Sequence, residues 1–180
     1  KNNLDRESTK DRNQILFGLI VKRTDIRVFP TDELSMNTPT NYEFDRFQHS
    51  SVSPGSLIGI YSFSKDRLWA YVQTRFIRGW VRTIDVAIAK ERSEAVGYEE
   101  AENQLVITGN FVKVFGDSLS QRPLFLAQMG ASFPILSVSV DSGTTSPCYV
   151  IKIPIRQTDG KLTFGKAYIR RYDDVRVGFL

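Results

Sequence analysis

The sequence predicts an all-β protein made of two consecutive small barrels with one short connecting helix. Short apolar or alternating segments recur along nearly the whole chain, and turn-forming residues such as Thr108–Asn110 and Thr158–Gly160 separate them. Only the stretch 83–103 has a helical pattern, and its surface side is acidic. Roughly 75 to 90 residues lie on either side of that helix, a length typical of a small barrel or sandwich.

The first half of the chain holds a polar tail, five expected strands and one long loop. Residues 1–14 lack apolar periodicity, which predicts a tail or a frayed helix. The loop, Pro30–Ser56, is rich in Thr, Asn, Ser and Pro, and loops of this length are usually functional or disordered. Its aromatic residues Tyr42, Phe44 and Phe47 indicate an ordered, packed loop. The expected strands are Ile15–Val21, Ile26–Phe29, Ser56–Ser64, Leu68–Thr74 and Gly79–Val81.

The second half repeats the pattern of short strands. We expect the first barrel over residues 15–103, including the long loop 30–56 and the trailing helix, and the second barrel over 104–180. The expected strands of the second barrel are Leu105–Thr108, Phe111–Gly116, Leu124–Gly130, Pro134–Val140, Cys148–Ile155, Leu162–Ile169 and Val175–Phe179.

The composition is that of a folded, mildly basic protein, with 41% hydrophobic residues and a net charge of +4. The basic residues are spread along the chain, and Lys90–Asn103 carries five Glu against one Lys and one Arg. Nucleic-acid binders usually show a concentrated basic patch, so nucleic acid is not the expected partner. A diffuse positive surface also suits an anionic wall polymer. No stretch approaches the roughly 18 apolar residues of a membrane span.

The residues needed for known catalytic centres are scarce. His49 is the only histidine and Cys148 the only cysteine, and they fall in different expected barrels. Cys148 lies in an alternating segment, which predicts a buried strand thiol, and His49 lies in a polar loop, which predicts a surface or loop-packing residue. No nucleophile, phosphate-binding or metal-binding motif is present. We therefore expect no catalytic residue, cofactor or metal site in this chain.

Both tryptophans lie in the segment Trp69–Val81. Side chains alternate along a strand, so Ala70 and Val72 share one face while Trp69 and Tyr71 share the other. Small and aliphatic residues suit the inside of a narrow barrel. With Val81 also inside, Trp80 faces out. The sequence thus predicts an outward aromatic patch of Trp69, Tyr71 and Trp80 that contacts a ligand or another domain. The alternative is that the long loop folds over these rings as a satellite core.

The long loop carries Asp45, Arg46 and Gln48 beside its aromatic residues. These polar groups are candidate ligand contacts, with Arg46 as a bidentate clamp for a carboxylate. They can equally be structural and hold the loop through backbone hydrogen bonds, and this is the interpretation we favour. Asp25 and Arg27, at the start of a strand, are expected to bridge to the same loop.

Three segments carry motifs in a specific order: "RTDIRVFPTD" (Arg23–Asp32), "FDRFQHSSVSPGSLIGIYSFSKDRLWAYV" (Phe44–Val72) and "GWVRTIDVA" (Gly79–Ala87). In this order they resemble the bacterial Src-homology-3-like (SH3b-type) domains that precede the catalytic domain of NlpC-type cell-wall cysteine peptidases. The resemblance covers about Val21–Ala89. From Leu105 onward the sequence is more distantly similar to the second such barrel of these peptidases.

The resemblance implies two consecutive SH3-like barrels whose partners are the peptidoglycan stem peptide and a C-terminal catalytic domain. In that family the catalytic Cys and His lie in the further domain, and no motif of that domain occurs in this sequence. The parent enzymes cut the stem peptide between D-glutamate and the diamino acid, and the barrels target the wall or shape the substrate cleft. The implied location is the bacterial cell envelope, periplasmic or secreted, with a signal peptide removed or outside this sequence.

Other interpretations stay open at this point. The chain is either a fragment of such a peptidase or a stand-alone relative that lost the enzyme. A protein- or peptide-binding interaction module with no wall role is the main alternative function. Nucleic-acid binding through exposed aromatic residues is a third, but the scattered charge and the acidic helix count against it.

Overall fold

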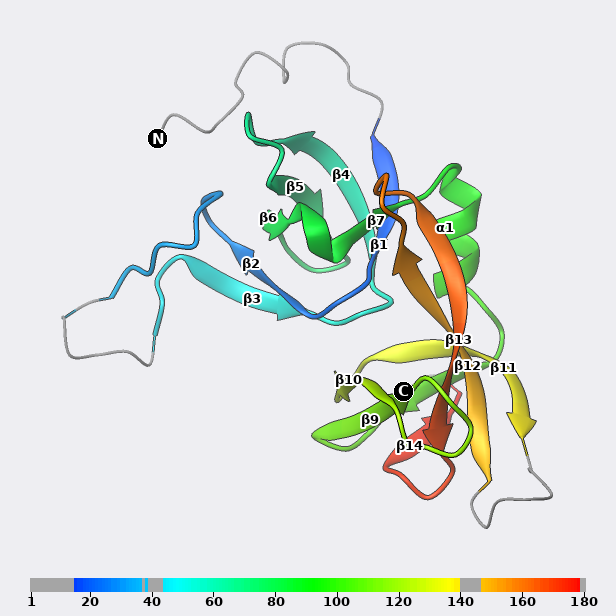
Figure 1. Cartoon of the computed structure of the whole chain (residues 1–180). Coiled ribbons are helices and arrows are strands. Elements are labelled where there is room, and N and C mark those ends of the chain that lie inside the picture. Colours follow the sequence, from blue (N-terminus) through cyan, green and yellow to red (C-terminus); the bar gives the residue numbers. More distant parts are fainter. Residues whose placement is uncertain (1–14, 37, 39–43, 140–146, 179–180) are drawn as a thin grey trace.

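In the computed structural model the chain folds into two seven-stranded antiparallel sheets, which confirms the predicted all-β class. The structure describes residues 15–36, 38, 44–139 and 147–178, so the expected tail 1–14 lies outside the described residues. Figure 1 shows the first sheet in blue to green and the second in green to red, with the helix α1 beside the junction. The predicted domain limits at 15–103 and 104–180 stay a prediction.

The first sheet has the strand order β3-β2-β6-β5-β4-β1-β7. The five expected strands all form close to their expected positions. Two further strands were not expected: β3, inside the predicted loop 30–56, and the short β7. The prediction that this loop has no element of its own is therefore wrong. The strands are β1 Leu16–Ile20, β2 Thr24–Arg27, β3 Gln48–Val52, β4 Leu57–Phe63, β5 Trp69–Gln73, β6 Arg78–Arg82 and β7 Val86–Ile88.

The second sheet has the order β10-β9-β13-β12-β11-β8-β14. Its seven strands match the seven that the sequence predicts, and β12 and β13 form its longest hairpin, paired over nine residues each. The strands are β8 Gln104–Ile107, β9 Phe111–Phe115, β10 Pro123–Gln128, β11 Ser132–Ser139, β12 Cys148–Arg156, β13 Leu162–Arg170 and β14 Val175–Val177.

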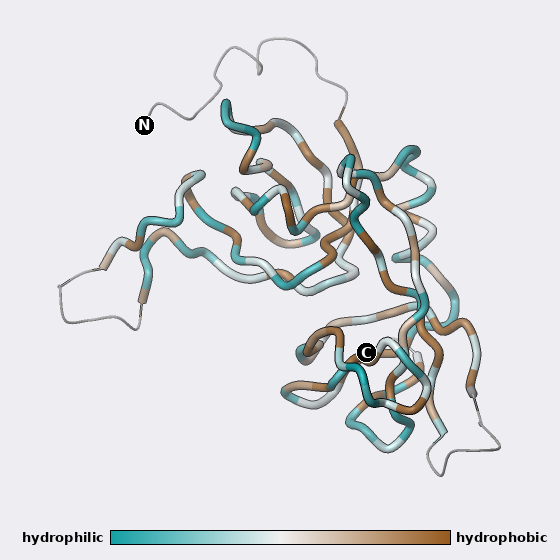
Figure 2. Tube along the Cα trace, in the orientation of Figure 1, coloured by the Kyte–Doolittle hydropathy of each residue, from teal (hydrophilic) through white to brown (hydrophobic). Residues whose placement is uncertain are grey.

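Each barrel is filled by one set of alternating aliphatic residues. In the first barrel Ile60, Ala70, Val72 and Val81 are at most 2% exposed and belong to one cluster. The second barrel has its own cluster, centred on Phe133, Ile151 and Ile169 among others. Figure 2 shows the apolar residues concentrated on the strands and the hydrophilic ones on the turns. The alternation seen in the sequence therefore fixes which strand face turns inward.

The helix is shorter than predicted. Within the stretch 83–103, residues Thr83–Asp85 form one 3-10 turn, Val86–Ile88 form β7, and only Arg92–Glu99 form the helix α1. The β-branched Val86 and Ile88 favour a strand, and β7 closes the first sheet by pairing with β1. The helix buries Ala95 and Tyr98 against the barrels.

The two barrels meet in a third apolar cluster. The tip of the β12–β13 hairpin lies beside β7 (Figure 1), where Ile88 N–H donates to the carbonyl of Gly160 at 3.0 Å. Leu19 and Ala87 of the first sheet pack with Tyr98 of α1 and Leu162 of β13. The joint thus combines backbone hydrogen bonding with buried apolar contact, and both features favour a fixed arrangement of the barrels.

Candidate functional site

The outer face of the first sheet carries a row of three aromatic rings, one from each of three neighbouring strands. Tyr71 and Trp80 are direct cross-strand partners, and their ring centroids lie 5.2 Å apart. Tyr61 of β4 extends the row, 6.3 Å from Tyr71. Because Val72 and Val81 occupy the barrel core, strand alternation turns these rings to the opposite face. We call Tyr61, Tyr71 and Trp80 the outer aromatic row.

The row is exposed only at one end. Tyr61 is 40% exposed and Tyr71 partly so, whereas Trp80 is 6% exposed and Trp69 only 3%. The prediction of an exposed patch is therefore wrong for both tryptophans, although their strand face was predicted correctly. The Arg82 guanidinium lies 4.6 Å from the centre of the Trp69 ring, in a cation–π contact that covers it. Arg82 also pairs with Asp32, which belongs to the long loop.

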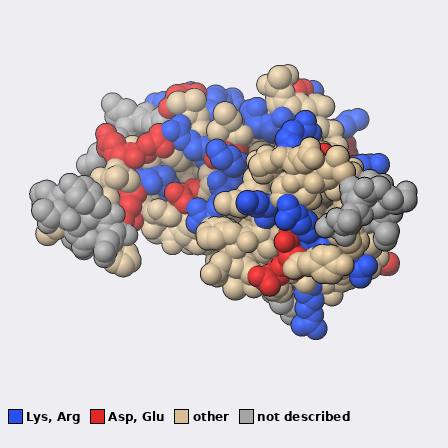
Figure 3. All heavy atoms as spheres, turned by 60° about the horizontal axis from the view of Figure 1, so that its bottom comes forward, with Lys and Arg blue, Asp and Glu red and all other residues tan. Residues whose placement is uncertain are grey.

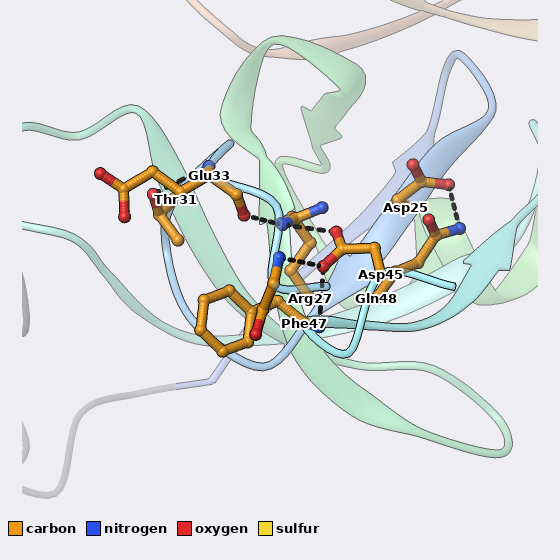
Figure 4. Close-up of polar contacts among 8 residues, drawn as sticks. Asp25, Arg27, Thr31, Glu33, Asp45, Phe47 and Gln48 are labelled. Atoms are coloured by element: carbon orange, nitrogen blue, oxygen red, sulfur yellow. Dashed lines mark hydrogen bonds and ion pairs between the residues drawn. The ribbon is translucent and has the colours of Figure 1, made fainter. Parts of the chain in front are cut away.

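Beyond Trp80, the next residue across the sheet is Arg27 of β2. Its guanidinium lies 2.8 Å from the carboxylate of Asp45, and both side chains are only 7% exposed. Arg27 also donates to the carbonyl oxygen of Glu33 at 2.6 Å. Figure 4 shows the guanidinium between the two sides of the loop. The expected bridge from Arg27 to the loop is confirmed, and it fixes the loop beside the outer aromatic row.

Asp45 is held by the backbone as well as by Arg27. Its Oδ1 accepts hydrogen bonds from the N–H groups of Ser35 at 2.9 Å and Phe47 at 3.0 Å. Burial acts to raise the pKa of Asp45, but these two hydrogen bonds and the Arg27 guanidinium outweigh it and hold the pKa below its usual value. The carboxylate therefore stays ionised and organises the loop, which is the structural role that we favoured from the sequence.

The remaining loop candidates are dispersed. Gln48 is exposed in β3, and its amide donates to Asp25 at 3.0 Å, so the predicted bridge from Asp25 is also present (Figure 4). Arg46 is exposed, and its backbone N–H donates to the carbonyl of Ser35. The structure thus brings Tyr71 and Trp80 together with Arg27 and Asp45 nearby, while Arg46 and Gln48 lie on the loop surface.

Sequence reasoning missed Tyr61 as a member of the site. The signal was present, because the core residues Ile58 and Ile60 alternate with Gly59 and Tyr61 along β4. The sequence did not show which residues of β4 and β5 lie opposite each other. A register shift between Ile60 and Ser62 displaces the pairing of β4 with β5, and such bulges redirect side chains without a reliable sequence mark.

His49 and Cys148 were not expected to form a catalytic pair, and the structure places them in different sheets. His49 is exposed in β3 of the first sheet, and Cys148 is 2% exposed in β12 of the second. The buried strand thiol and the surface histidine are as predicted. Among the described residues, no group of three His, Cys, Asp or Glu side chains is placed to hold a metal ion. Among the same residues, no helix is long and apolar enough to cross a membrane.

Basic and acidic side chains are interspersed on the face drawn in Figure 3. Lys and Arg side chains are spread over much of this face, with Asp and Glu side chains between them. This agrees with the spread of basic residues along the sequence. The mixture of charges on this face differs from the dense basic stripe typical of a nucleic-acid interface.

Comparison with known proteins places the fold. A family model described as an SH3 domain of SH3b1 type matches residues 35–82, the part that contains the outer aromatic row. No curated protein matches the chain. The chain is similar to the solved structure of an NlpC/P60 endopeptidase from Photobacterium damselae subsp. piscicida, with a TM-score of 0.70 and 18% sequence identity. The match covers 98% of this chain and 36% of that one, so this chain spans about a third of the endopeptidase and shares its fold there.

Proposed function

We propose that this chain is a non-catalytic module of a bacterial peptidoglycan stem-peptide hydrolase, where it forms one wall of the substrate cleft. The observation that carries the proposal is a structural match to an NlpC/P60 endopeptidase that covers 98% of this chain and therefore includes both of its barrels. A likeness over one barrel alone is common to many binding modules. A shared arrangement of two consecutive barrels is more restrictive.

Two roles are compatible with such a module: targeting to the wall, and shaping of the cleft. The joint between the barrels favours the second. A buried cluster and a backbone hydrogen bond between Ile88 and Gly160 join them. A wall tether gains nothing from this stiffness, whereas a cleft wall must hold its contact residues in place relative to the catalytic groups.

The outer aromatic row is the surface that we assign to the stem peptide or to the catalytic domain. It presents the exposed edge of Tyr61 and part of Tyr71 above the buried Trp80. Aromatic side chains on a rigid sheet supply contact area at low entropic cost. The ion pair between Arg27 and Asp45 holds the loop at one end of the row. A hydrolase with this module acts in the cell envelope, where its substrate is.

The test uses the full-length protein that the gene encodes. Wild type and the Tyr61→Ala and Tyr71→Ala variants are assayed for release of stem-peptide fragments and for sedimentation with purified peptidoglycan. We expect kcat/KM to fall about tenfold, as for the loss of one aromatic contact, with unchanged sedimentation. Phe111→Ala, which removes a 61% exposed ring from the second barrel, is the matched control.

The results separate the proposal from its rivals. Loss of sedimentation with unchanged kcat/KM on soluble fragments would assign targeting to the row and overturn the cleft role. If the full-length protein neither binds peptidoglycan nor releases peptides, the proposal is wrong, and an interaction module with no wall role is the remaining interpretation. Thermal unfolding of each variant establishes that the fold is intact.

A further inference from the structure

A cavity of about 260 Å³ lies between the two barrels, away from the outer aromatic row. It shares no residue with that row. The first barrel contributes β3 with the turn after it and the turn Thr74–Ile77, and the second contributes the turn Gly130–Ser132. The end of α1 closes one side. At about 30 Å³ per water molecule, the volume is on the order of nine waters, which suits an amino acid or a dipeptide.

One wall of the cavity is a turn whose backbone is held by many hydrogen bonds. The Thr74 hydroxyl accepts from the N–H groups of Phe76 and Ile77 and donates to the carbonyl of Ile77. The Gln73 amide donates to the carbonyl of Thr74 at 2.6 Å. This network fixes a turn that presents Arg75 and an 88% exposed Phe76 beside the cavity. An exposed phenylalanine on a rigid turn is a feature of contact surfaces.

A second part of the lining is polar and carries negative charge. Gln104 is 2% exposed, and its amide donates to the carbonyl oxygens of Tyr98 and Glu99 at 3.1 and 3.2 Å. These two contacts fix the orientation of the amide, and its Oε1 is a buried acceptor with no hydrogen-bond partner in the described part of the chain. The Glu99 side chain is exposed where α1 ends. This part of the lining thus offers the Glu99 carboxylate, while Gln104 fixes the end of α1 from beneath.

The floor of the cavity depends on a close approach between the barrels. Gly55 has a φ of +89°, and a Cβ at this position would lie 3.0 Å from the carbonyl oxygen of Ser132 and 3.3 Å from the Tyr98 hydroxyl. Glycine therefore permits both the turn and the contact. Because the Tyr98 hydroxyl is itself bonded to the carbonyl of Lys152 at 3.0 Å, the floor is part of the fixed joint, and the cavity is preformed.

We propose that this cavity binds a short zwitterionic peptide, with its carboxylate on Arg75, its amino group on Glu99 and an apolar side chain against Phe76. A guanidinium and a carboxylate in the lining of one cavity complement the two ends of such a ligand. Glu99 disfavours a phosphate or nucleotide, and the serine residues of β3 and the following turns disfavour a purely apolar ligand. The proposal does not rest on the proposed function, because it uses no residue of the outer aromatic row.

The test titrates the ¹⁵N-labelled chain with three probes: Ala-Ala with free termini, acetyl-Ala-Ala and Ala-Ala-amide. Free Ala-Ala is expected to shift the amide resonances of residues 50–56, 74–77 and 130–132 and to bind at least tenfold more tightly than either blocked peptide. Arg75→Gln should weaken free Ala-Ala about tenfold and leave Ala-Ala-amide unchanged. Glu99→Gln should do the same for free Ala-Ala and leave acetyl-Ala-Ala unchanged.

Arg75 and Glu99 are exposed, so their substitutions leave the core intact. Arg78→Gln and Glu100→Gln are the matched controls, since both side chains are exposed and neither lines the cavity. Two results would overturn the proposal. One is that free Ala-Ala at millimolar concentration shifts none of these resonances. The other is that the blocked and free peptides bind equally, which would show that the charged termini are not recognised.

Discussion

Tyr98 of α1 stacks on Phe164 of β13, with the ring centroids 5.4 Å apart and the planes within 5° of parallel. On the Phe164 ring also lies the Lys152 ammonium group, 3.8 Å from its centroid. The Tyr98 hydroxyl donates to the carbonyl of Lys152 at 3.0 Å, and burial raises the pKa of this phenol. One side chain thus joins the helix after the first sheet to the central hairpin of the second.

Removal of Tyr98 should therefore uncouple the barrels. We expect Tyr98→Ala to lower the free energy of unfolding by about 3–5 kcal/mol, as for a large buried ring, and to split one thermal transition into two. Tyr98→Phe keeps the stack and loses the hydrogen bond, which costs about 1 kcal/mol. Tyr172→Ala, at a 79% exposed tyrosine, should have almost no effect. A single unchanged calorimetric transition in Tyr98→Ala would contradict this account of the joint.

The buried ion pair between Arg27 and Asp45 should be costly to break. Asp45→Ala leaves a guanidinium 7% exposed without its counter-charge, so we expect a loss of about 3–5 kcal/mol in urea unfolding. Replacement of both partners, in Arg27→Met with Asp45→Leu, should restore only part of the loss, because the N–H groups of Ser35 and Phe47 still lack their acceptor. Asp159→Ala breaks the exposed pair with Lys161 and should cost far less, because water screens this pair. Equal losses in the two single variants would show that burial does not set the cost.

The same pair makes stability depend on pH. Because its pKa in the fold is below the ordinary value of 3.8, the Asp45 carboxylate stabilises the protein above the unfolded-state pKa, and this contribution disappears as the pH falls through the folded-state pKa. The stability difference between wild type and Asp45→Asn should hold from pH 7 to about 5 and narrow below 4.

At Asp173 we expect stability to change with pH in the opposite direction, because partial burial raises the pKa of this carboxyl group. Relative to Asp173→Asn, wild type should gain stability as the pH falls through the raised pKa. Urea unfolding at a series of pH values measures both differences. The same pH trend in both variants would mean that global charge, and not these two environments, sets the dependence.

The strand pattern was readable from the sequence because side-chain alternation is a local property. Ala70, Val72 and Val81 lie in the core as predicted, and so Tyr71 and Trp80 lie on the outer face. Strand alternation does not show which side chains of other strands pack against each residue. Arg82, on another strand, lies over the ring of Trp69, and this contact contributes to the burial of the ring. Burial of an outward side chain depends on tertiary partners, and for this reason the expected exposed patch did not form around the tryptophans.

The stretch 83–103 and the loop 30–56 also show that tertiary pairing cannot be read from the local sequence. Val86 and Ile88 join the first sheet as β7 because an edge of that sheet is available to them, and the amphipathic pattern of the stretch does not reveal this. Gln48–Val52 is polar and exposed over most of its length, yet it pairs with β2 as β3. A polar edge strand has no apolar period to recognise. The cavity between the barrels was invisible for a related reason, since its walls come from segments far apart in sequence.

Replacement of glycine by alanine should have opposite effects on the free energy of unfolding at Gly79 and at Gly97. A Cβ on Gly79 of β6 would lie 2.4 Å from Cγ2 of Ile26 and 2.8 Å from the carbonyl oxygen of Arg27. Gly79→Ala therefore overpacks the barrel where β6 crosses β2, and we expect a loss of about 1–3 kcal/mol. Gly97 lies in α1 with nothing within 4 Å of a Cβ, so Gly97→Ala should stabilise the protein by about 0.5–1 kcal/mol. Chemical unfolding of the two variants measures both values. Equal effects on the free energy of unfolding, or a loss of stability in Gly97→Ala, would show that helix propensity and steric fit do not decide these positions.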